Sequence, residues 1–94
     1  MNSKIKVGLV GAKFAARFHF EGYQRVYGVP LEVVGLTSKS KESREAFAAK
    51  HEVKAFNSLQ EMLRDVDVVD ICAPGYVHES AAVESFKAGK DVIV

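Results

Sequence analysis

Short apolar runs alternate along this chain with segments in which apolar residues recur at helical spacing. The runs predict five strands, at residues 5–10, 31–36, 53–56, 66–73 and 91–94. Strands that alternate with helices are typical of βαβ units, in which parallel strands carry helices on both faces. Right-handed crossovers favour the strand order 3-2-1-4-5. The pattern therefore predicts an α/β fold with a doubly wound parallel sheet, in which the short run at 53–56 is an edge strand.

The segments between the runs carry start and stop signals for helices. Helices are expected over residues 14–27, after Ser40, after Ser58 and over 77–88. Serine is a favoured N-cap, and Gly28 and Gly89 are suited to end the helices that precede them. Their buried faces are predicted to contain Ala46, Phe47, Ala49, Leu59, Met62, Leu63, Ala81, Ala82, Ser85 and Phe86.

The first strand passes directly into the first helix at Gly11. Unpaired N–H groups and the helix dipole make such a junction a binding site for an anion such as a pyrophosphate. Gly11 can make the tight turn and Ala16 can let the helix lie close to the strand, as in the G-x-x-x-x-G/A outline of a dinucleotide fingerprint. Lys13 stands where the middle glycine is expected, so its side chain must swing aside, where it can pair with a phosphate. The alternative is a plain strand-turn-helix with a solvated Lys13.

The predicted strand order brings the carboxyl ends of the first and fourth strands together, and ligands of such folds bind in the crevice there. On one side we expect Gly11, Lys13, Phe14 and Ala15 to bind the cofactor, and on the other Ala73, Pro74, Gly75 and His78.

Composition limits the possible partners and location. The chain has 94 residues, of which 48% are hydrophobic, and 13 basic against 12 acidic side chains give a net charge of +1. These values predict one domain at most and no nucleic-acid or membrane partner. Cys72 has no disulfide partner, and neither a signal peptide nor a membrane-spanning run is visible. We therefore expect a cytoplasmic protein.

Several segments in register resemble the amino-terminal domain of the Gfo/Idh/MocA oxidoreductase family. They are Gly8 to Gly11 leading to Ala16 and His19, then Ser58 to Leu63, Ala73 to Gly75 with His78, and Ala88 to Val94. The resemblance implies an NAD(P)-binding Rossmann domain over residues 1–94 of a longer two-domain dehydrogenase that acts on a sugar, a cyclitol or a similar hydroxylated molecule. Family members usually have glycine at the place of Lys13 and Thr-Pro-Asn at the place of residues 73–75.

The resemblance also implies what should follow this chain. In the family, a Glu-Lys-Pro motif whose lysine acts on the substrate follows the strand matched by residues 92–94, and a second domain holds the substrate and mediates oligomers. We therefore expect the sixth strand, the catalytic lysine and the substrate domain to lie beyond Val94, and the parent protein to be a homo-oligomer. No catalytic residue is expected within the 94 residues.

The end of the second strand bears on the choice of cofactor. An Asp or Glu there would bind the ribose 2′-hydroxyl of NAD, but the sequence reads Thr37-Ser38-Lys39. Ser38 and Lys39 can donate to a 2′-phosphate, helped by Lys41 or Arg44. This favours NADP over NAD. The alternative is a polar loop with solvated lysines.

The three histidines and Cys72 show no metal-ligand spacing in the sequence. His78-Glu79 begins like a zinc-protease helix, but Ala82 occupies the second histidine position. His78 is expected to pack and hydrogen-bond near the cofactor, and His19 and His51 to be structural or solvated. Asp70 interrupts an apolar strand, so it must lie at an exposed end or accept hydrogen bonds from a neighbouring helix start.

Two other functions remain open at this point. Rossmann-like domains also serve as non-catalytic nucleotide sensors, because fold alone does not fix function. S-adenosylmethionine is a further possible ligand, but the lack of an acidic residue at Ser38 argues against it.

Overall fold

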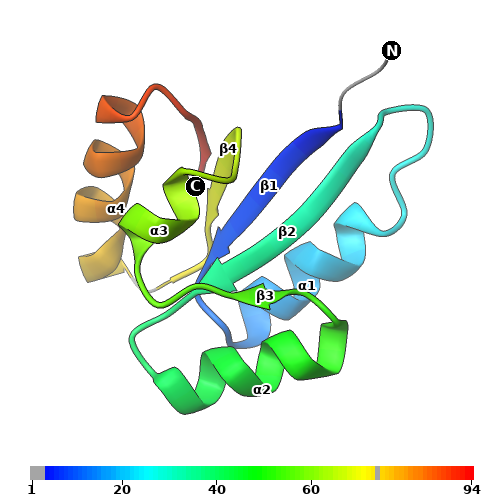
Figure 1. Cartoon of the computed structure of the whole chain (residues 1–94), viewed down its shortest axis with the longest axis horizontal. Helices are drawn as coiled ribbons and strands as arrows, with labels where there is room; N and C mark the ends of the chain where they lie inside the picture. Colours follow the sequence, from blue (N-terminus) through cyan, green and yellow to red (C-terminus); the bar gives the residue numbers. More distant parts are fainter. Residues whose placement is uncertain (1–3, 74) are drawn as a thin grey trace.

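The computed structural model describes residues 4–73 and 75–94 and contains one parallel sheet (Figure 1). Its strands are β1 (Ile5–Val10), β2 (Leu31–Thr37), β3 (Lys54–Ala55), β4 (Val68–Ile71) and β5 (Asp91–Ile93). They lie in the order β3-β2-β1-β4-β5, and every neighbouring pair is parallel. The predicted doubly wound Rossmann topology is therefore confirmed, with β3 at one edge.

Helices cover both faces of the sheet. They are α1 (Phe14–Tyr23), α2 (Lys41–His51), α3 (Leu59–Leu63) and α4 (Gly75–Lys87). Side chains of α1 and α2 pack into one hydrophobic cluster, and side chains of α3 and α4 pack into another. Within the described residues, no helix combines the length and apolar character that a bilayer crossing requires.

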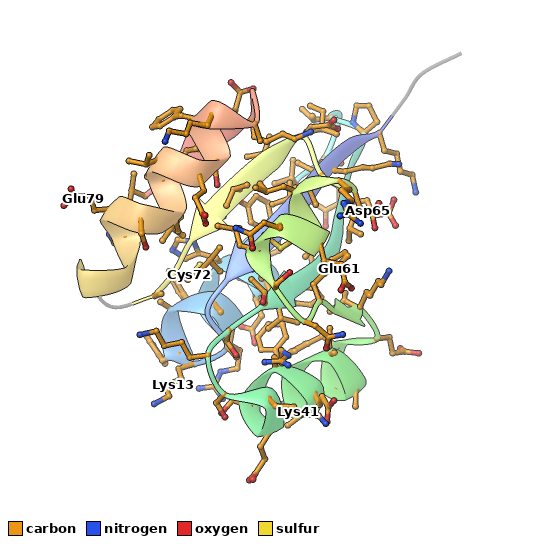
Figure 2. The ribbon with its side chains drawn as sticks, turned by 60° about the vertical axis from the view of Figure 1, so that its left-hand side comes forward. Lys13, Lys41, Glu61, Asp65, Cys72 and Glu79 are labelled. Atoms are coloured by element: carbon orange, nitrogen blue, oxygen red, sulfur yellow. The ribbon has the colours of Figure 1, made fainter. Side chains whose placement is uncertain are left out.

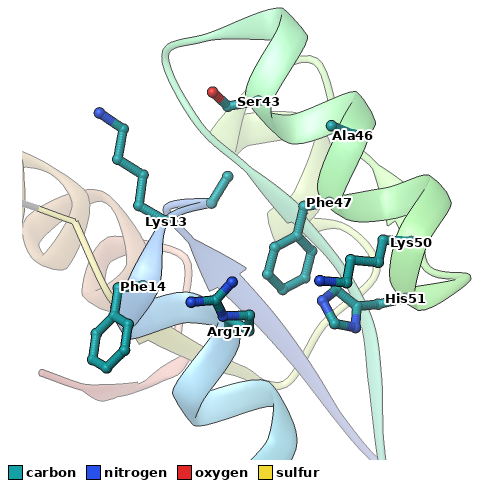
Figure 3. A pocket seen from close by; sticks show the side chains of 9 residues that line it. Lys13, Phe14, Arg17, Ser43, Ala46, Phe47, Lys50 and His51 are labelled. Carbon is teal, nitrogen blue, oxygen red and sulfur yellow. The ribbon is translucent and has the colours of Figure 1, made fainter.

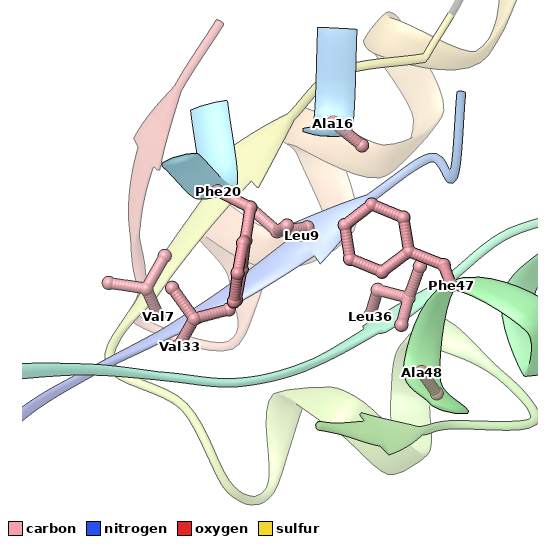
Figure 4. Packing of buried hydrophobic residues seen from close by; sticks show 8 residues of the cluster. All are labelled: Val7, Leu9, Ala16, Phe20, Val33, Leu36, Phe47 and Ala48. Atoms are coloured by element: carbon pink, nitrogen blue, oxygen red, sulfur yellow. The ribbon is translucent and has the colours of Figure 1, made fainter. Parts of the chain in front are cut away.

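Alternation along β1 supplies both clusters, because successive side chains of a strand point to opposite faces. Val7 and Leu9 belong to the cluster under α1 and α2, whereas Val10 belongs to the other. Phe20 and Phe47 pack over the first face edge to face, with ring centroids 5.9 Å apart (Figure 4). Through this contact α1 packs against α2 beside the predicted cofactor site.

The predicted N-caps and one predicted stop are confirmed. The Ser40 hydroxyl accepts a hydrogen bond from the Ser43 N–H, and the Ser58 hydroxyl accepts one from the Glu61 N–H, both at 3.1 Å. Gly89, which follows α4, has a φ of +77°. No glycine marks the end of α2 in the sequence. Glu52 takes the left-handed conformation there instead, with a φ of 57°.

Some predicted boundaries were wrong. The first helix ends at Tyr23 rather than at residue 27, and Val26 and Tyr27 are exposed. A longer helix would gain no buried surface there, and burial supplies most helix stability in proteins. The last helix begins at Gly75, two positions before the predicted start at 77, and β4 covers only part of the predicted run.

The predicted buried faces were partly wrong. On α2 the buried residues are Arg44, Phe47 and Ala48, whereas Ala46 and Ala49 are exposed. Helical spacing puts positions 44, 47 and 48 on one side, and the aliphatic stem of an arginine can be buried there. On α4, Ala81 and Ser85 are buried as predicted, but Phe86 is 64% exposed.

Candidate cofactor site

The carboxyl ends of three strands meet at Gly11. The Gly11 N–H donates to the Thr37 carbonyl at the end of β2, and the Cys72 N–H donates to the Val10 carbonyl, both at 2.8 Å. Gly11 has a φ of +118°, and a Cβ added to it would lie 3.1 Å from the Cys72 carbonyl oxygen. Both the conformation and the close approach require glycine. The carboxyl ends of β1, β2 and β4 therefore lie together at Gly11, where the crevice is expected.

The start of α1 has no side-chain cap. Lys13 is its N-cap residue and makes no capping hydrogen bond, whereas the serine caps of α2 and α3 do. The first N–H groups of a helix have no partner within the helix, so those of Phe14 and Ala15 can bind an anion. This junction is the expected position of the diphosphate of a dinucleotide.

The Lys13 side chain is exposed and leaves the start of α1 accessible. Figure 3 shows it extending away from Phe14 and Arg17. Phe14 is exposed as well, and its ring stacks on that of Phe18 with centroids 6.2 Å apart. The Arg17 guanidinium lies 5.8 Å from the Phe14 ring centroid.

A cavity of about 300 Å³ lies between the start of α1 and α2 (Figure 3). Lys13, Arg17 and Lys50 contribute cationic groups to its lining, and no carboxylate is among the lining residues. His51 also lines it, and burial together with nearby Lys50 lowers the pKa of His51. The cavity therefore suits an anionic or polar group on the β2 side of Gly11.

The loop after β2 is held by Arg44. The Arg44 guanidinium donates to the Ser38 carbonyl at 3.0 Å, and the Ser38 hydroxyl donates to the Ser40 carbonyl at 3.0 Å. Arg44 is buried, and its Nε has no hydrogen-bond partner in the described part of the chain. The spacing from Arg44 to Phe47 and Ala48 is the signal that would have placed this arginine on the buried face.

The residues expected on the other side of the crevice lie between β4 and α4. Ala73 is close to Gly11, since the added Cβ would lie 3.3 Å from the Ala73 N. Gly75 is exposed at the first position of α4, and His78 is half-buried in the next turn. Pro74 lies outside the described residues. The structure thus brings Gly11, the start of α1 and Ala73 together, with Ser38 next to Thr37 at the same edge of the sheet.

The surroundings of Asp70 differ from both expectations. Its side chain is 1% exposed, and Oδ2 accepts hydrogen bonds from the Tyr23 hydroxyl at 2.7 Å and from His19 Nδ1 at 2.8 Å. The partners are therefore side chains of α1, not an exposed strand end or a helix start. Because they lie 47 and 51 positions away, no sequence spacing indicates them.

Cys72 extends this polar network. Its Sγ lies 3.4 Å from His19 Nδ1 and 3.5 Å from Asp70 Oδ1. Burial raises the pKa of the Cys72 thiol, and the Asp70 charge and hydrogen bond raise it further. The pKa of Tyr23 is raised as well, mainly by burial and to a lesser extent by the hydrogen bond to Asp70. Figure 2 shows Cys72 inside the outline of the fold, whereas Glu79 points outwards.

Comparison with known proteins gives a curated relative and close structural matches. UDP-N-acetylglucosamine 3-dehydrogenase from Acidithiobacillus ferrooxidans is 26% identical over 90 residues, which are 96% of this chain and 28% of that protein. The WlbA dehydrogenase from Bordetella pertussis, solved with NADH and UDP-GlcNAcA, is 28% identical with a TM-score of 0.85, covering 96% of this chain and 28% of that one. Biliverdin reductase from Synechocystis sp. PCC 6803, solved with biliverdin and NADP+, is 26% identical with a TM-score of 0.83. The match covers 94% of this chain and 28% of that one.

This chain therefore spans little more than a quarter of the length of these relatives. The model of the oxidoreductase family with an NAD-binding Rossmann fold matches residues 5–94, which include every strand, every helix and the Gly11 junction. The chain belongs to this family, Gfo/Idh/MocA.

Proposed function

We propose that this chain is the cofactor-binding domain of a nicotinamide-dependent dehydrogenase that acts on a hydroxyl-bearing carbon of a sugar-like substrate. The observation that carries the proposal is the Gly11 junction, where an uncapped helix start faces the meeting point of three strand ends. Membership of the oxidoreductase family supports the same assignment.

Different residues are proposed to bind the diphosphate, the adenosine half and the nicotinamide half of the cofactor. In this proposal the N–H groups at the start of α1 bind the diphosphate, and the Lys13 ammonium approaches it from the solvent side. The adenosine half extends towards Ser38 and the cavity beside α2, and the nicotinamide half extends towards Ala73, Gly75 and His78. When bound, the nicotinamide exchanges a hydride with the substrate carbon, while the domain supplies orientation and electrostatics.

The substrate is proposed to be a sugar or sugar nucleotide held by a second domain that this chain does not include. Two of the similar proteins support this class, because one is a UDP-N-acetylglucosamine dehydrogenase and another was solved with UDP-GlcNAcA. The proposal makes residues 1–94 the cofactor-binding part of the longer enzyme and places the catalytic lysine outside it.

For the cofactor we propose a preference for NADP over NAD. No carboxylate stands at residues 38–40, directly after β2, to repel a 2′-phosphate, and Lys39 follows Ser38 in the loop. Arg44 brings a second positive charge to the same loop through its hydrogen bond to the Ser38 carbonyl. Relatives of similar identity were solved with NADH and with NADP+, so likeness to them does not decide the question.

Titration calorimetry of the protein with NADPH and NADH tests both proposals. We expect Gly11→Ala to abolish binding of both cofactors, because a side chain there is strained and contacts the Cys72 carbonyl. Gly28→Ala is the matched control, since Gly28 also has a positive φ, of +82°, but nothing lies near its added Cβ. Unchanged binding by Gly11→Ala would refute the site.

The proposed preference for NADP over NAD is tested by calorimetry with a further pair of variants. Ser38→Asp introduces the missing carboxylate and should weaken NADPH binding by at least tenfold while leaving NADH binding within about twofold, because only NADPH carries the repelled phosphate. Ser38→Asn, which adds similar bulk without charge, is the control. Tighter binding of NADH than of NADPH by the unchanged protein would refute the preference and leave the cofactor site intact.

The proposed setting is the cytoplasm, where a free thiol such as that of Cys72 stays reduced. The family resemblance further implies a homo-oligomer of the longer protein. Light scattering of the longer protein during size-exclusion chromatography tests this, and a monomeric mass would contradict it.

A further inference from the structure

Three metal-ligating side chains meet behind the crevice, outside the residues assigned to the cofactor. His19 comes from α1, Asp70 from β4, and Cys72 from the residue that follows β4. Their donor atoms all lie within 4.8 Å of one another. Asp70 is almost fully buried, whereas the His19 side chain is 35% exposed and Cys72 is half-buried.

The distances from the Cys72 sulfur to its two neighbouring donor atoms fit a tetrahedral ion. Zinc binds Cys at about 2.3 Å and His or Asp at about 2.0 Å, which places a sulfur about 3.5 Å from a neighbouring nitrogen or oxygen ligand. Cys72 Sγ lies 3.4 Å from His19 Nδ1 and 3.5 Å from Asp70 Oδ1. His19 Nδ1 is hydrogen-bonded at 2.8 Å to the other carboxylate oxygen, Oδ2, and the ion replaces this hydrogen bond.

Tyr23 orients the carboxylate. Its hydroxyl donates to Asp70 Oδ2 at 2.7 Å, while Oδ1 faces the Cys72 sulfur. Hydrogen bonds of this kind to a ligating carboxylate fix its orientation and strengthen metal binding.

We propose that His19 Nδ1, the Asp70 carboxylate and Cys72 Sγ bind one thiophilic divalent cation of the Zn²⁺ class, with water as the fourth ligand. Binding displaces the thiol proton of Cys72 into solvent, and the neutral His19 imidazole then carries its single proton on Nε2, which leaves Nδ1 free to bind the ion. The carboxylate and the thiolate together neutralise the two positive charges of the ion. The ion then joins α1 to the end of β4 and reinforces the wall behind Ala73. Nothing in the cofactor proposal depends on it.

Titration of the metal-free protein with Co²⁺ tests the site directly. We expect one equivalent to produce the thiolate-to-Co²⁺ charge-transfer absorption, and Zn²⁺ to displace it. Cys72→Ser should abolish the band, and Tyr23→Phe should weaken Zn²⁺ binding by about tenfold. His51→Gln is the matched control, because His51 lies on α2 against Phe20 and Phe47 and should leave the band unchanged.

A second measurement needs no variant. Cys72 is the only cysteine of the chain, so thiol alkylation reports on this site alone. Zn²⁺ should slow alkylation of the unchanged protein by at least tenfold, and Mg²⁺, which prefers oxygen ligands, should not. Absence of the Co²⁺–thiolate band, or alkylation at the same rate with and without Zn²⁺, overturns the proposal.

Discussion

The Tyr23 hydroxyl donates a 2.7 Å hydrogen bond to the buried carboxylate of Asp70, which ties the last residue of α1 to the centre of β4. The two residues are 47 positions apart. A buried carboxylate is costly unless it is hydrogen-bonded, so this contact stabilises both the strand and the end of the helix.

Tyr23→Phe removes that donor and leaves the Asp70 carboxylate with a less satisfied oxygen. We expect the free energy of unfolding to fall by about 1.5–3 kcal/mol, the usual range for hydrogen bonds to charged groups. Urea denaturation followed by circular dichroism measures the change. Tyr27→Phe removes a hydroxyl from a side chain that is 88% exposed and should have little effect. Equal losses in the two variants would contradict the assigned role of Tyr23.

Two glycines should respond to alanine in opposite directions. A Cβ on Gly35 would collide with the Lys54 carbonyl oxygen across the β2–β3 pair and crowd the Phe56 ring, so Gly35→Ala should destabilise the protein strongly. Gly22 lies in α1 with no atom within 4 Å of its added Cβ. Gly22→Ala should therefore stabilise the protein by about 0.5–1 kcal/mol, because alanine favours helix. Thermal unfolding midpoints that shift in the same direction would refute the predicted close approach at Gly35.

The contact proposed between Lys13 and the cofactor diphosphate should depend on salt. If its ammonium pairs with the diphosphate, Lys13→Ala should weaken dinucleotide binding by about tenfold at low salt and by less at high salt. Lys87→Ala, at the far end of α4, is the control for a general loss of positive charge. Dinucleotide affinity that is the same in the Lys13→Ala variant and the unchanged protein would favour a solvated lysine.

The reactivity of Cys72 should depend on Asp70. Burial and the Asp70 charge raise the pKa of the thiol, so little thiolate exists near neutral pH and alkylation should be slow. Asp70→Asn removes the negative charge and should lower the pKa of Cys72, which speeds metal-free alkylation at pH 8. Rates measured with iodoacetamide in native buffer test this. A slower reaction in Asp70→Asn would show that Asp70 does not suppress the thiolate.

His51 should make stability depend on pH. Burial, and to a lesser extent Lys50 and Arg17, lower its pKa from 6.5 in the folded state, and nearby Glu21 opposes them. The unfolded state then binds the proton more readily, so the stabilising contribution is present above pH 6.5 and is lost as the pH falls through the folded pKa. His51→Gln should remove this loss. Unfolding free energies compared from pH 8 to pH 5 test it, and equally steep falls in both proteins would refute it.

Much of the fold could be predicted because its signals are local. The strand order followed from the alternation of apolar runs and helices, and the serine caps followed from hydrogen bonds that span three residues. The tight turn at Gly11 is a property of a glycine between a strand and a helix. These features depend on backbone conformation over a few neighbouring positions.

The end of α1 and the buried face of α2 depended instead on which surfaces of the helices and the sheet pack together. The end of α1 at Tyr23 and the burial of Arg44 instead of Ala46 and Ala49 are set by where the sheet offers a surface to cover. Helical periodicity limits the choice of face but does not select it, because propensity is weak compared with burial.

The sequence by itself determined the order of elements, their caps and the glycine turn at the proposed cofactor site, since each rests on interactions between near neighbours in the chain. Only the tertiary structure decided the partners of Asp70 and the meeting of His19 with Cys72. Those side chains lie 47 to 53 positions apart, and packing of α1 against β4 alone brings them within hydrogen-bonding distance.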